Sequence, residues 1–237
     1  MKLNISKTNY IFFQNRSLKN TIPPIKLEGE ILKQMNHTKF LGVLIDENLN
    51  WKLHIDEICF KVAKTCGIMY KIRYNLTTEA LISIYYTLCY PYLTYCVPIW
   101  ASTWPSFLKK VIITQNKIVR CISFSGKYDS VTEIMSSMNI LKFDLIYKYF
   151  SLLLIYKMSV HHIGNDIFNF VSNVHLTRSN DIDLCCPQFR TALFKNSILC
   201  SGPKLFNGLP LNKKTMLKSH NYLSFKREIK KYLHQQS

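Results

Sequence analysis

Acidic residues are scarce in this sequence, where 14 Asp and Glu stand against 31 Lys and Arg and give a formal charge of +17. Few carboxylates are therefore left for reactions that need clustered acids, such as two-metal phosphoryl transfer. At 48% hydrophobic residues the chain nevertheless has enough apolar material for a core, so it is not a disordered polycation. A folded basic chain favours a polyanionic partner, either nucleic acid or an anionic membrane.

Glycine is also rare, with seven residues in the whole chain. The sequence has no glycine-rich phosphate loop and no Gly-x-Ser-x-Gly elbow, so two common catalytic motifs are missing. The eight cysteines include no Cys-x-x-Cys pair, which excludes zinc-ribbon and thioredoxin-like spacing. Because the first residues carry no apolar signal core, we expect reduced thiols and a nuclear or cytoplasmic protein that is not secreted.

Charged residues are absent from residues 80–108. The stretch is longer than the ~20 apolar residues that a membrane helix needs, but Pro91, Pro98 and Pro105 interrupt it too often for a span. We therefore expect no transmembrane segment, and interpret the stretch as a buried helix that stops near Pro91 and an apolar loop. Docking of a protein partner or a membrane surface on it stays open as an alternative function.

The first fifty residues favour strands and the following ones favour helices, which predicts an α+β fold that is predominantly α. Strand-forming residues occur at 10–13, 25–32 and 39–46, with a hairpin around Gly29 and one continuous apolar strand over 39–46. Residues 161–208 break the helical pattern, and we expect loops and a short strand there.

Six helices are predicted from apolar residues that recur at steps of three and four. They lie near residues 51–70, 78–90, 106–122, 129–138, 144–158 and 221–234. Thr77 or Thr78 and Asp129 are the expected N-caps of the second and fourth. The helix over 144–158 is apolar on nearly all sides, which indicates a central buried helix.

His54 and Asp56 have the His-x-Asp spacing of a non-haem iron site, which would need a second histidine such as His161, His162 or His175. The two residues fall on the first turn of a predicted helix, where Asp56 favours the helix dipole and His54 lies at the surface or packs locally. An iron-dependent oxygenase is the least favoured alternative, and we expect no metal site and no catalytic residue.

Basic residues gather on the outer faces of two predicted helices, opposite their apolar stripes. These cations are the candidate nucleic-acid-binding residues: Lys109, Lys110, Lys117, Arg120, Lys226, Arg227, Lys230 and Lys231. Aromatic residues such as Tyr70, Tyr74, Tyr85, Tyr86 and Tyr90 can stack on bases or pack in the core, and packing is the default interpretation.

Several segments, taken in order, resemble reverse transcriptases of non-LTR retrotransposons of the jockey and CR1 type. Residues 39–55 match K-[YF]-L-G-V-x-[IL]-D-x-x-L-x-W-x-x-H-I, and residues 3–8 match L-N-x-x-K-T. The other matching segments are residues 84–100, residues 115–120 with Q-N-K-x-x-R, residues 202–210 with G-x-x-L-W-N-x-L-P, and Phe225 with Lys226. Two residues depart from these patterns, because Cys96 stands where glycine is usual and Phe206 where tryptophan is usual.

The resemblance implies a domain order. Residues 1–50 would be the palm edge and primer grip, residues 51–160 a helical thumb-like domain, and residues 161–237 a loop-rich region that ends in a basic helix. In this family the metal-binding aspartates precede the L-N-x-x-K-T segment, so the chain is expected to be a truncated, catalytically inactive remnant of an RNA-directed DNA polymerase.

By the same resemblance, Phe40, Leu41 and Gly42 form a primer-grip-like segment, and Lys7 lies near the incoming nucleotide of an intact enzyme. Mg²⁺ would belong to that intact enzyme, and no cofactor is expected for this chain. The expected activity is non-specific binding of RNA, DNA or an RNA/DNA hybrid, with the missing polymerase portion as a further partner.

Overall fold

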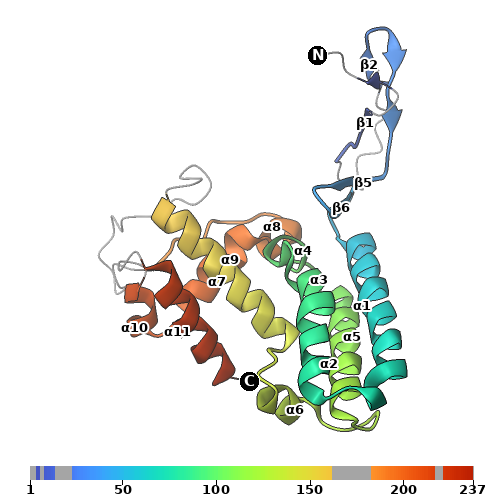
Figure 1. Ribbon diagram of the computed structural model, residues 1–237. Helices are drawn as coiled ribbons and strands as arrows, with labels where there is room; N and C mark the ends of the chain where they lie inside the picture. Colours follow the sequence, from blue (N-terminus) through green and yellow to red (C-terminus); the bar gives the residue numbers. More distant parts are fainter. Residues whose placement is uncertain (1–3, 6–7, 14–22, 162–182, 217–220, 237) are drawn as a thin grey trace. The chain divides into compact units, whose positions relative to one another are not determined.

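The structure is a computed structural model that describes residues 4–5, 8–13, 23–161, 183–216 and 221–236 (Figure 1). The chain divides into two compact units, Met1–Glu57 and Ile58–Ser237. Helices dominate the described residues, and the strands form sheets of two strands each. This confirms the predicted α+β class with a predominance of helix.

Short strand pairs make up the first unit. β1 (Asn9–Tyr10) pairs in parallel with β4 (Lys33–Gln34), and β2 (Lys26–Leu27) pairs antiparallel with β3 (Glu30–Ile31). Glu28 and Gly29 join β2 to β3 with φ angles of 51° and 87°, the double positive φ of a type I′ turn. The hairpin predicted around Gly29 is therefore present, whereas the strand predicted over 10–13 is limited to its first residue.

The apolar run over residues 39–46 is a hairpin, and the prediction of one continuous strand was wrong. β5 (His37–Phe40) pairs antiparallel with β6 (Val43–Asp46), and Phe40 lies opposite Val43. Leu41 and Gly42 make the turn with φ angles of 45° and 85°. A leucine at positive φ is uncommon, so composition alone favoured a strand through this point.

Asp46 organises the passage from β6 into α1 (Lys52–Ile72). Its buried carboxylate accepts hydrogen bonds from the backbone N–H groups of Asn48, Asn50 and Trp51, at 3.0, 3.3 and 3.0 Å. Leu49 and Trp51 have positive φ angles, which turn the chain sharply before the helix starts. Three donors that would otherwise lack partners near a helix N-terminus are thus satisfied by one side chain.

Helices form the second unit, into which α1 continues. They are η2 (Arg73–Asn75), α2 (Thr78–Ile84), the π-helix η3 (Tyr85–Cys89), α3 (Tyr90–Thr94), α4 (Val97–Trp100), α5 (Pro105–Ser123), α6 (Val131–Ser137), α7 (Phe143–His161), α8 (Ala192–Asn196), α9 (Ile198–Asn207), α10 (Leu211–Lys214) and α11 (Tyr222–His234). Thr77 caps α2 as predicted, because its hydroxyl oxygen accepts the N–H of Ala80.

The helix expected to stop near Pro91 continues to Thr94, and this prediction was wrong. The π-helix η3 joins α2 to α3, and the N–H of Tyr90 donates to the carbonyl of Tyr85, five residues back. The wider turn shifts the bonding pattern just ahead of Pro91, where an α-helix would need the N–H that proline lacks. Figure 1 shows α2 and α3 as one helical rod.

Asp129 does not cap the following helix, which corrects a second detail. The N-cap of α6 is Ser130 and its side chain makes no capping bond, whereas the Asp129 carboxylate accepts the N–H of Gly126. The carboxylate therefore closes the loop that precedes the helix.

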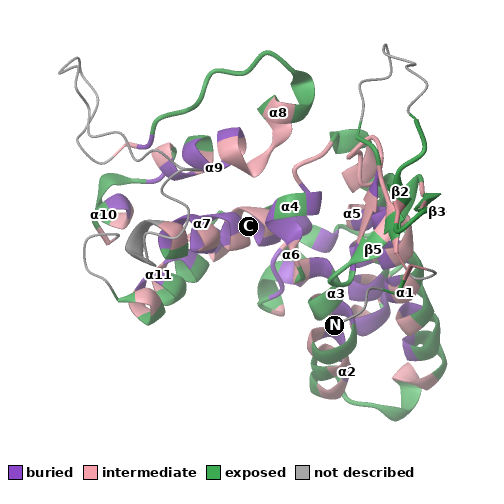
Figure 2. Ribbon diagram, turned by 90° about the horizontal axis from the view of Figure 1, so that it is seen from above, coloured by how far each residue is buried: buried purple, intermediate pink, exposed green. Residues whose placement is uncertain are grey.

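The helix α7 is the centre of a large core, as its all-round apolar sequence predicted. Its buried side chains, Tyr149, Leu152 and Tyr156 among them, cluster with Phe206 of α9 and Phe225 of α11. The Tyr156 and Phe225 rings stack with 4.5 Å between centroids. Figure 2 shows buried residues along most of α7, while α11 is exposed on its outer side.

Residues 183–191 have no helix or strand, as predicted, but the rest of this segment forms two helices, α8 and α9, where loops and a short strand were expected. α9 is helical despite Pro203, and it buries Cys200, Gly202 and Phe206. Glycine and proline in its sequence weakened the helical pattern. Residues 162–182 lie outside the described part of the chain.

Candidate nucleic-acid interface

The helix α5 presents a basic outer face because most of its apolar residues pack on the other side, although Ile113 is 45% exposed. Pro105 occupies the first turn, and the buried side chains are Val111, Gln115, Ile118, Val119, Cys121 and Ile122. Lys109, Lys110 and Lys117 are exposed, as the spacing predicted. Within the described residues neither Lys109 nor Lys117 forms an ion pair.

Arg120, the fourth predicted cation of α5, is engaged inside the protein. Its Nη2 and Nε donate to the backbone carbonyl of Asp129 at 3.0 and 3.4 Å. Arg120 thus holds the loop between α5 and α6 by its backbone, while the Asp129 side chain holds Gly126. These hydrogen bonds give Arg120 a structural role in the loop, in addition to any contact with a ligand.

Gln115 is the buried member of the Q-N-K-x-x-R segment. Its Nε2 donates to the hydroxyl of Tyr85 at 3.0 Å and to the carbonyl of Leu141 at 2.9 Å. The amide therefore connects α5 with the π-helix and with the segment that leads into α7. The segment thus combines an internal tie at Gln115, an exposed cation at Lys117 and a loop anchor at Arg120.

The C-terminal helix α11 is a second basic surface. Asn221 caps it by accepting the N–H of Ser224, and Phe225, Ile229 and Leu233 are buried. Lys226, Arg227, Lys230 and Lys231 are all exposed, as predicted.

Glu228 partly neutralises this surface of α11. Its carboxylate pairs with Lys213 at 2.7 Å and with Lys231 at 3.3 Å, and these hydrogen bonds lower the pKa of Glu228. Lys226, Arg227 and Lys230 form no ion pair among the described residues, so they carry the net charge of the helix.

The predicted primer-grip-like segment lies at the tip of the β5–β6 hairpin. Phe40 and Leu41 are 62% and 74% exposed, and Gly42 completes the turn. Two large apolar side chains exposed at one turn make the tip a candidate contact surface. Lys7, the residue expected near the nucleotide, lies outside the described residues.

His54 and Asp56 are not brought together with other metal-ligand types. The described residues contain no group of three or more His, Cys, Asp or Glu side chains that could hold a metal ion. His54 is buried, and its Nδ1 accepts the N–H of Leu44 at 3.3 Å, which ties α1 to β6. His161 lies at the end of α7 and its side chain is not described, and His162 and His175 are outside the described part.

The uncharged stretch over residues 80–108 contributes part of its side chains to the core. Leu81, Tyr85, Leu93, Val97 and Trp100 are fully buried. No described helix is long and apolar enough to cross a membrane. The stretch thus has a buried side and an exposed side, and the exposed side carries large apolar residues: Leu88, Tyr92, Tyr95, Ile99 and Trp104.

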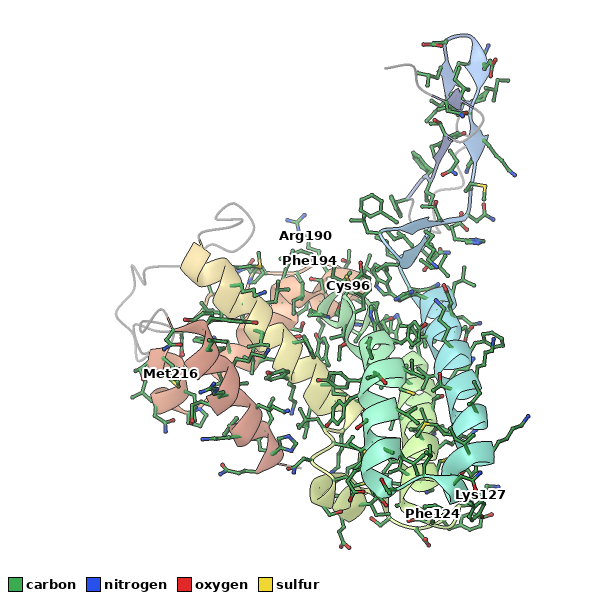
Figure 3. All side chains as sticks on the ribbon, viewed as in Figure 1. Cys96, Phe124, Lys127, Arg190, Phe194 and Met216 are labelled. Atoms are coloured by element: carbon green, nitrogen blue, oxygen red, sulfur yellow. The ribbon has the colours of Figure 1, made fainter. Side chains whose placement is uncertain are left out.

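Cys96 occupies a backbone position that suits glycine. It is the N-cap of α4 with φ 51° and ψ 24°, in the left-handed region (labelled in Figure 3). The glycine expected here by resemblance has no Cβ and adopts this conformation without strain. Phe206, the other departure, is fully buried in the α7 core.

The thiols are free, and most of them are buried. Burial raises the pKa of Cys66 to about 11 and that of Cys89 to about 12, so both thiols are neutral at physiological pH. Neutral buried thiols act as small apolar groups in the helical unit.

The predicted tyrosines fall into two groups. Tyr85 is buried, and Tyr86 and Tyr90 pack edge to face with 5.3 Å between ring centroids. Tyr70 and Tyr74 are exposed beside Arg73 and Phe124, two residues that the sequence reasoning missed. Only the cation-aromatic order Tyr-Lys-Ile-Arg-Tyr over residues 70–74 signalled this group.

Known proteins resemble about half of this chain. The probable RNA-directed DNA polymerase of the Drosophila melanogaster transposon X-element is 31% identical over 125 residues, which are 51% of this chain and 13% of that protein. This chain carries a region homologous to jockey-type reverse transcriptases. The RNA-directed DNA polymerase of the D. melanogaster mobile element jockey is 27% identical over 146 residues, or 60% of this chain and 16% of the relative.

A third relative, the probable RNA-directed DNA polymerase of the D. melanogaster transposon BS, is 25% identical over 143 residues, 59% of this chain and 16% of the relative. The chain therefore spans about one seventh of the length of these curated relatives. No family model and no solved structure matches it. The family resemblance found in the sequence motifs is confirmed.

Proposed function

We propose that this chain is a nucleic-acid-holding portion of a mobile-element reverse transcriptase, and that it binds the phosphate backbone without reading sequence. The observation that supports the proposal is the amphipathic character of α5 and α11, each with an apolar side and a basic side. Each helix packs an apolar side against the core and exposes cations that form no ion pair within the described part of the chain, among them Lys109, Lys117, Lys226 and Lys230. Cations placed in this way release condensed counterions when they meet phosphates.

The preferred ligand is a duplex of RNA and DNA, because that is the product of an RNA-directed DNA polymerase. The exposed hairpin tip at Phe40 and Leu41 is proposed to contact the primer strand. In an intact enzyme, Lys7 is proposed by resemblance to lie near the incoming nucleotide. The rest of the polymerase is the proposed protein partner, and the proposed location is the nucleus or cytoplasm.

We assign no chemical step to this chain. Two-metal nucleotidyl transfer needs carboxylates that share ions, and the described residues bring no such cluster together. Mg²⁺ would therefore be held by polymerase residues other than those described here. The chain is proposed to be catalytically inactive when it is alone.

Salt dependence of binding tests the proposal. The affinity of the full chain for a fluorescent 20-base-pair RNA/DNA hybrid would be measured by anisotropy between about 50 and 200 mM KCl. For a contact with Z phosphates, log K falls with log salt with a slope of roughly −0.9Z. A slope near zero would reject phosphate-backbone binding.

Charge-neutral variants locate the surface. Lys109→Gln with Lys117→Gln on α5, and Lys226→Gln with Lys230→Gln on α11, should each reduce the slope by roughly one to two units. The matched control is Lys195→Gln with Lys204→Gln, which removes two exposed cations from α8 and α9. Equal losses in the control and the test pairs would mean that overall charge, not these two faces, governs binding.

A further inference from the structure

Exposed aromatic rings surround Arg73 where α1 ends and α5 ends. The guanidinium carbon of Arg73 lies 4.8 Å from the ring centre of Tyr70 and 4.9 Å from those of Tyr74 and Phe124. Tyr70, Tyr74 and Phe124 are 43%, 75% and 45% exposed. These four residues form the Arg73 platform.

The backbone explains why these side chains meet. Tyr70 is in the last turn of α1, whereas Arg73 and Tyr74 belong to the short 3-10 helix η2 that follows it. Phe124 is the C-cap of α5 with φ 57°, and this left-handed residue turns the chain at the end of the helix. Aromatic rings from the ends of two helices thus lie around one guanidinium group.

Arg73 also fixes the rings relative to one another. Its Nη2 donates to the Tyr74 hydroxyl at 2.9 Å, and the rings of Tyr74 and Phe124 are 5.5 Å apart and tilted by 60°. Cation–π contacts of this kind contribute even at exposed sites. The platform is therefore pre-organised, although its rings remain open to solvent.

The surroundings of the platform are cationic. Lys71 lies between Tyr70 and Arg73, Lys127 follows Phe124 by three residues, and residues 58–78 and 105–128 contain no acidic residue. The acidic residues that follow these two ranges are Glu79 and Asp129, and the Asp129 carboxylate accepts the N–H of Gly126. Lys127 lies over the ring of Tyr128, 5.5 Å from its centre. Figure 3 shows Phe124 and Lys127 together at this end of the helices. The charge is complementary to a polyanion.

We propose that the Arg73 platform binds single-stranded nucleic acid by stacking unpaired bases on Tyr74 and Phe124, while Lys71 and Lys127 contact the adjacent phosphates. Duplex ends aside, base faces are hidden within a helix, so exposed rings add affinity for an unpaired strand. Cations alone would hold paired and unpaired strands without this distinction. The inference rests on the proposed function and adds a ligand class and a separate site to it.

Base stacking is separated from phosphate binding by an abasic control. Anisotropy would compare full-length protein binding to a single-stranded 12-mer of deoxythymidine with binding to an abasic 12-mer that has the same phosphates. We expect the base-bearing strand to bind roughly ten-fold more tightly, which is the size of one good base–aromatic stack. Tyr74→Ala should remove this preference, and Tyr74→Phe should keep it because the ring remains.

Tyr95→Ala is the matched control, since Tyr95 is an exposed tyrosine away from the platform. It should leave the preference unchanged, and thermal melting of each variant verifies that the fold is intact. Equal affinity for the two 12-mers, or a preference that survives Tyr74→Ala, would overturn the platform while leaving backbone binding in place. If neither the 12-mers nor the hybrid binds, the proposed function fails as well.

Discussion

The carboxylate of Asp46 accepts a hydrogen bond from the backbone N–H of Trp51, with 3.0 Å between Oδ2 and N. Asp46 ends the β5–β6 hairpin and Trp51 immediately precedes α1, so one side chain joins the strand end to the helix start. His54 adds a second tie through Leu44. The family-like segment over residues 39–55 thus encodes a local structural junction, apart from any contact with nucleic acid.

Asp46→Ala is expected to destabilise this junction. The substitution leaves three backbone N–H groups without their acceptor, and we expect a loss of about 2 kcal/mol in the free energy of unfolding. Urea denaturation followed by circular dichroism measures it. Glu47→Ala removes the same charge from the adjacent residue and should shift the midpoint little. Equal effects of the two variants would assign the loss to charge instead of to the hydrogen bonds.

Cys96→Gly is expected to stabilise the protein. The left-handed backbone at Cys96 has φ 51°, and relief of its Cβ strain should add roughly 1 kcal/mol. Cys96→Ala removes the thiol but retains a Cβ, so it should show no such gain. The comparison is made by thermal melting, and a melting temperature that rises equally in both variants would contradict the backbone explanation.

Gln115→Leu is expected to destabilise the helical unit despite the apolar surroundings of Gln115. It removes the donor that serves the Tyr85 hydroxyl and the Leu141 carbonyl. A buried carbonyl without a donor costs about 1–3 kcal/mol. The adjacent Asn116→Ala, at a half-buried position, should cost less in the same urea titration. An unchanged free energy of unfolding in Gln115→Leu would show that these two hydrogen bonds make no net contribution to stability.

Local signals in the sequence predicted the helices best. The apolar spacing of Phe225, Ile229 and Leu233 predicted α11 nearly to the residue, and the structure adds Asn221 as its N-cap. These features depend on contacts between near neighbours, which propensity and periodicity describe. The exposed cations of α5 and α11 followed from the same spacing.

Features that depend on unusual backbone or on distant partners were missed. Leu41 takes a positive φ that leucine rarely adopts, so the β5–β6 turn was not visible in the composition. The π-helix before Pro91 and the contact of Arg120 with the carbonyl of Asp129 depend on backbone geometry that the spacing of apolar residues does not describe. Arg73 and Phe124 are 51 positions apart, and only the fold brings them together.

Arg120→Ala and Lys117→Ala should separate a structural cation from a binding cation. Arg120 donates to the carbonyl of Asp129, so its loss should lower the free energy of unfolding by roughly 1 kcal/mol. Lys117 is exposed, and its loss should leave stability within about 0.5 kcal/mol while weakening hybrid binding. Melting curves and anisotropy on both variants measure the two effects, and unchanged melting of Arg120→Ala would remove the loop-anchor role.

The free energy of unfolding should fall as the pH rises above 9. Burial raises the pKa of Cys66 from 9.0 to about 11, so the folded chain keeps a proton that the unfolded chain releases. The contribution of this thiol is therefore complete below pH 9 and is lost progressively between pH 9 and 11, by at most about 1.4 kcal/mol per pH unit. Urea titrations at pH 8, 9, 10 and 11 measure this slope.

Cys66→Ala isolates the part of the slope that belongs to this thiol. Other buried groups, such as Cys89 with its pKa of about 12, also contribute less to the stability of the fold in alkali. The slope of the wild type alone therefore does not identify Cys66 as its cause. Between pH 9 and 11 the free energy of unfolding should fall less steeply with pH in the variant than in the wild type. Below pH 9 the two plots of unfolding free energy against pH should run parallel. An identical slope would mean that Cys66 has an ordinary pKa in the folded chain, which in turn would require solvent to reach the buried face of α1.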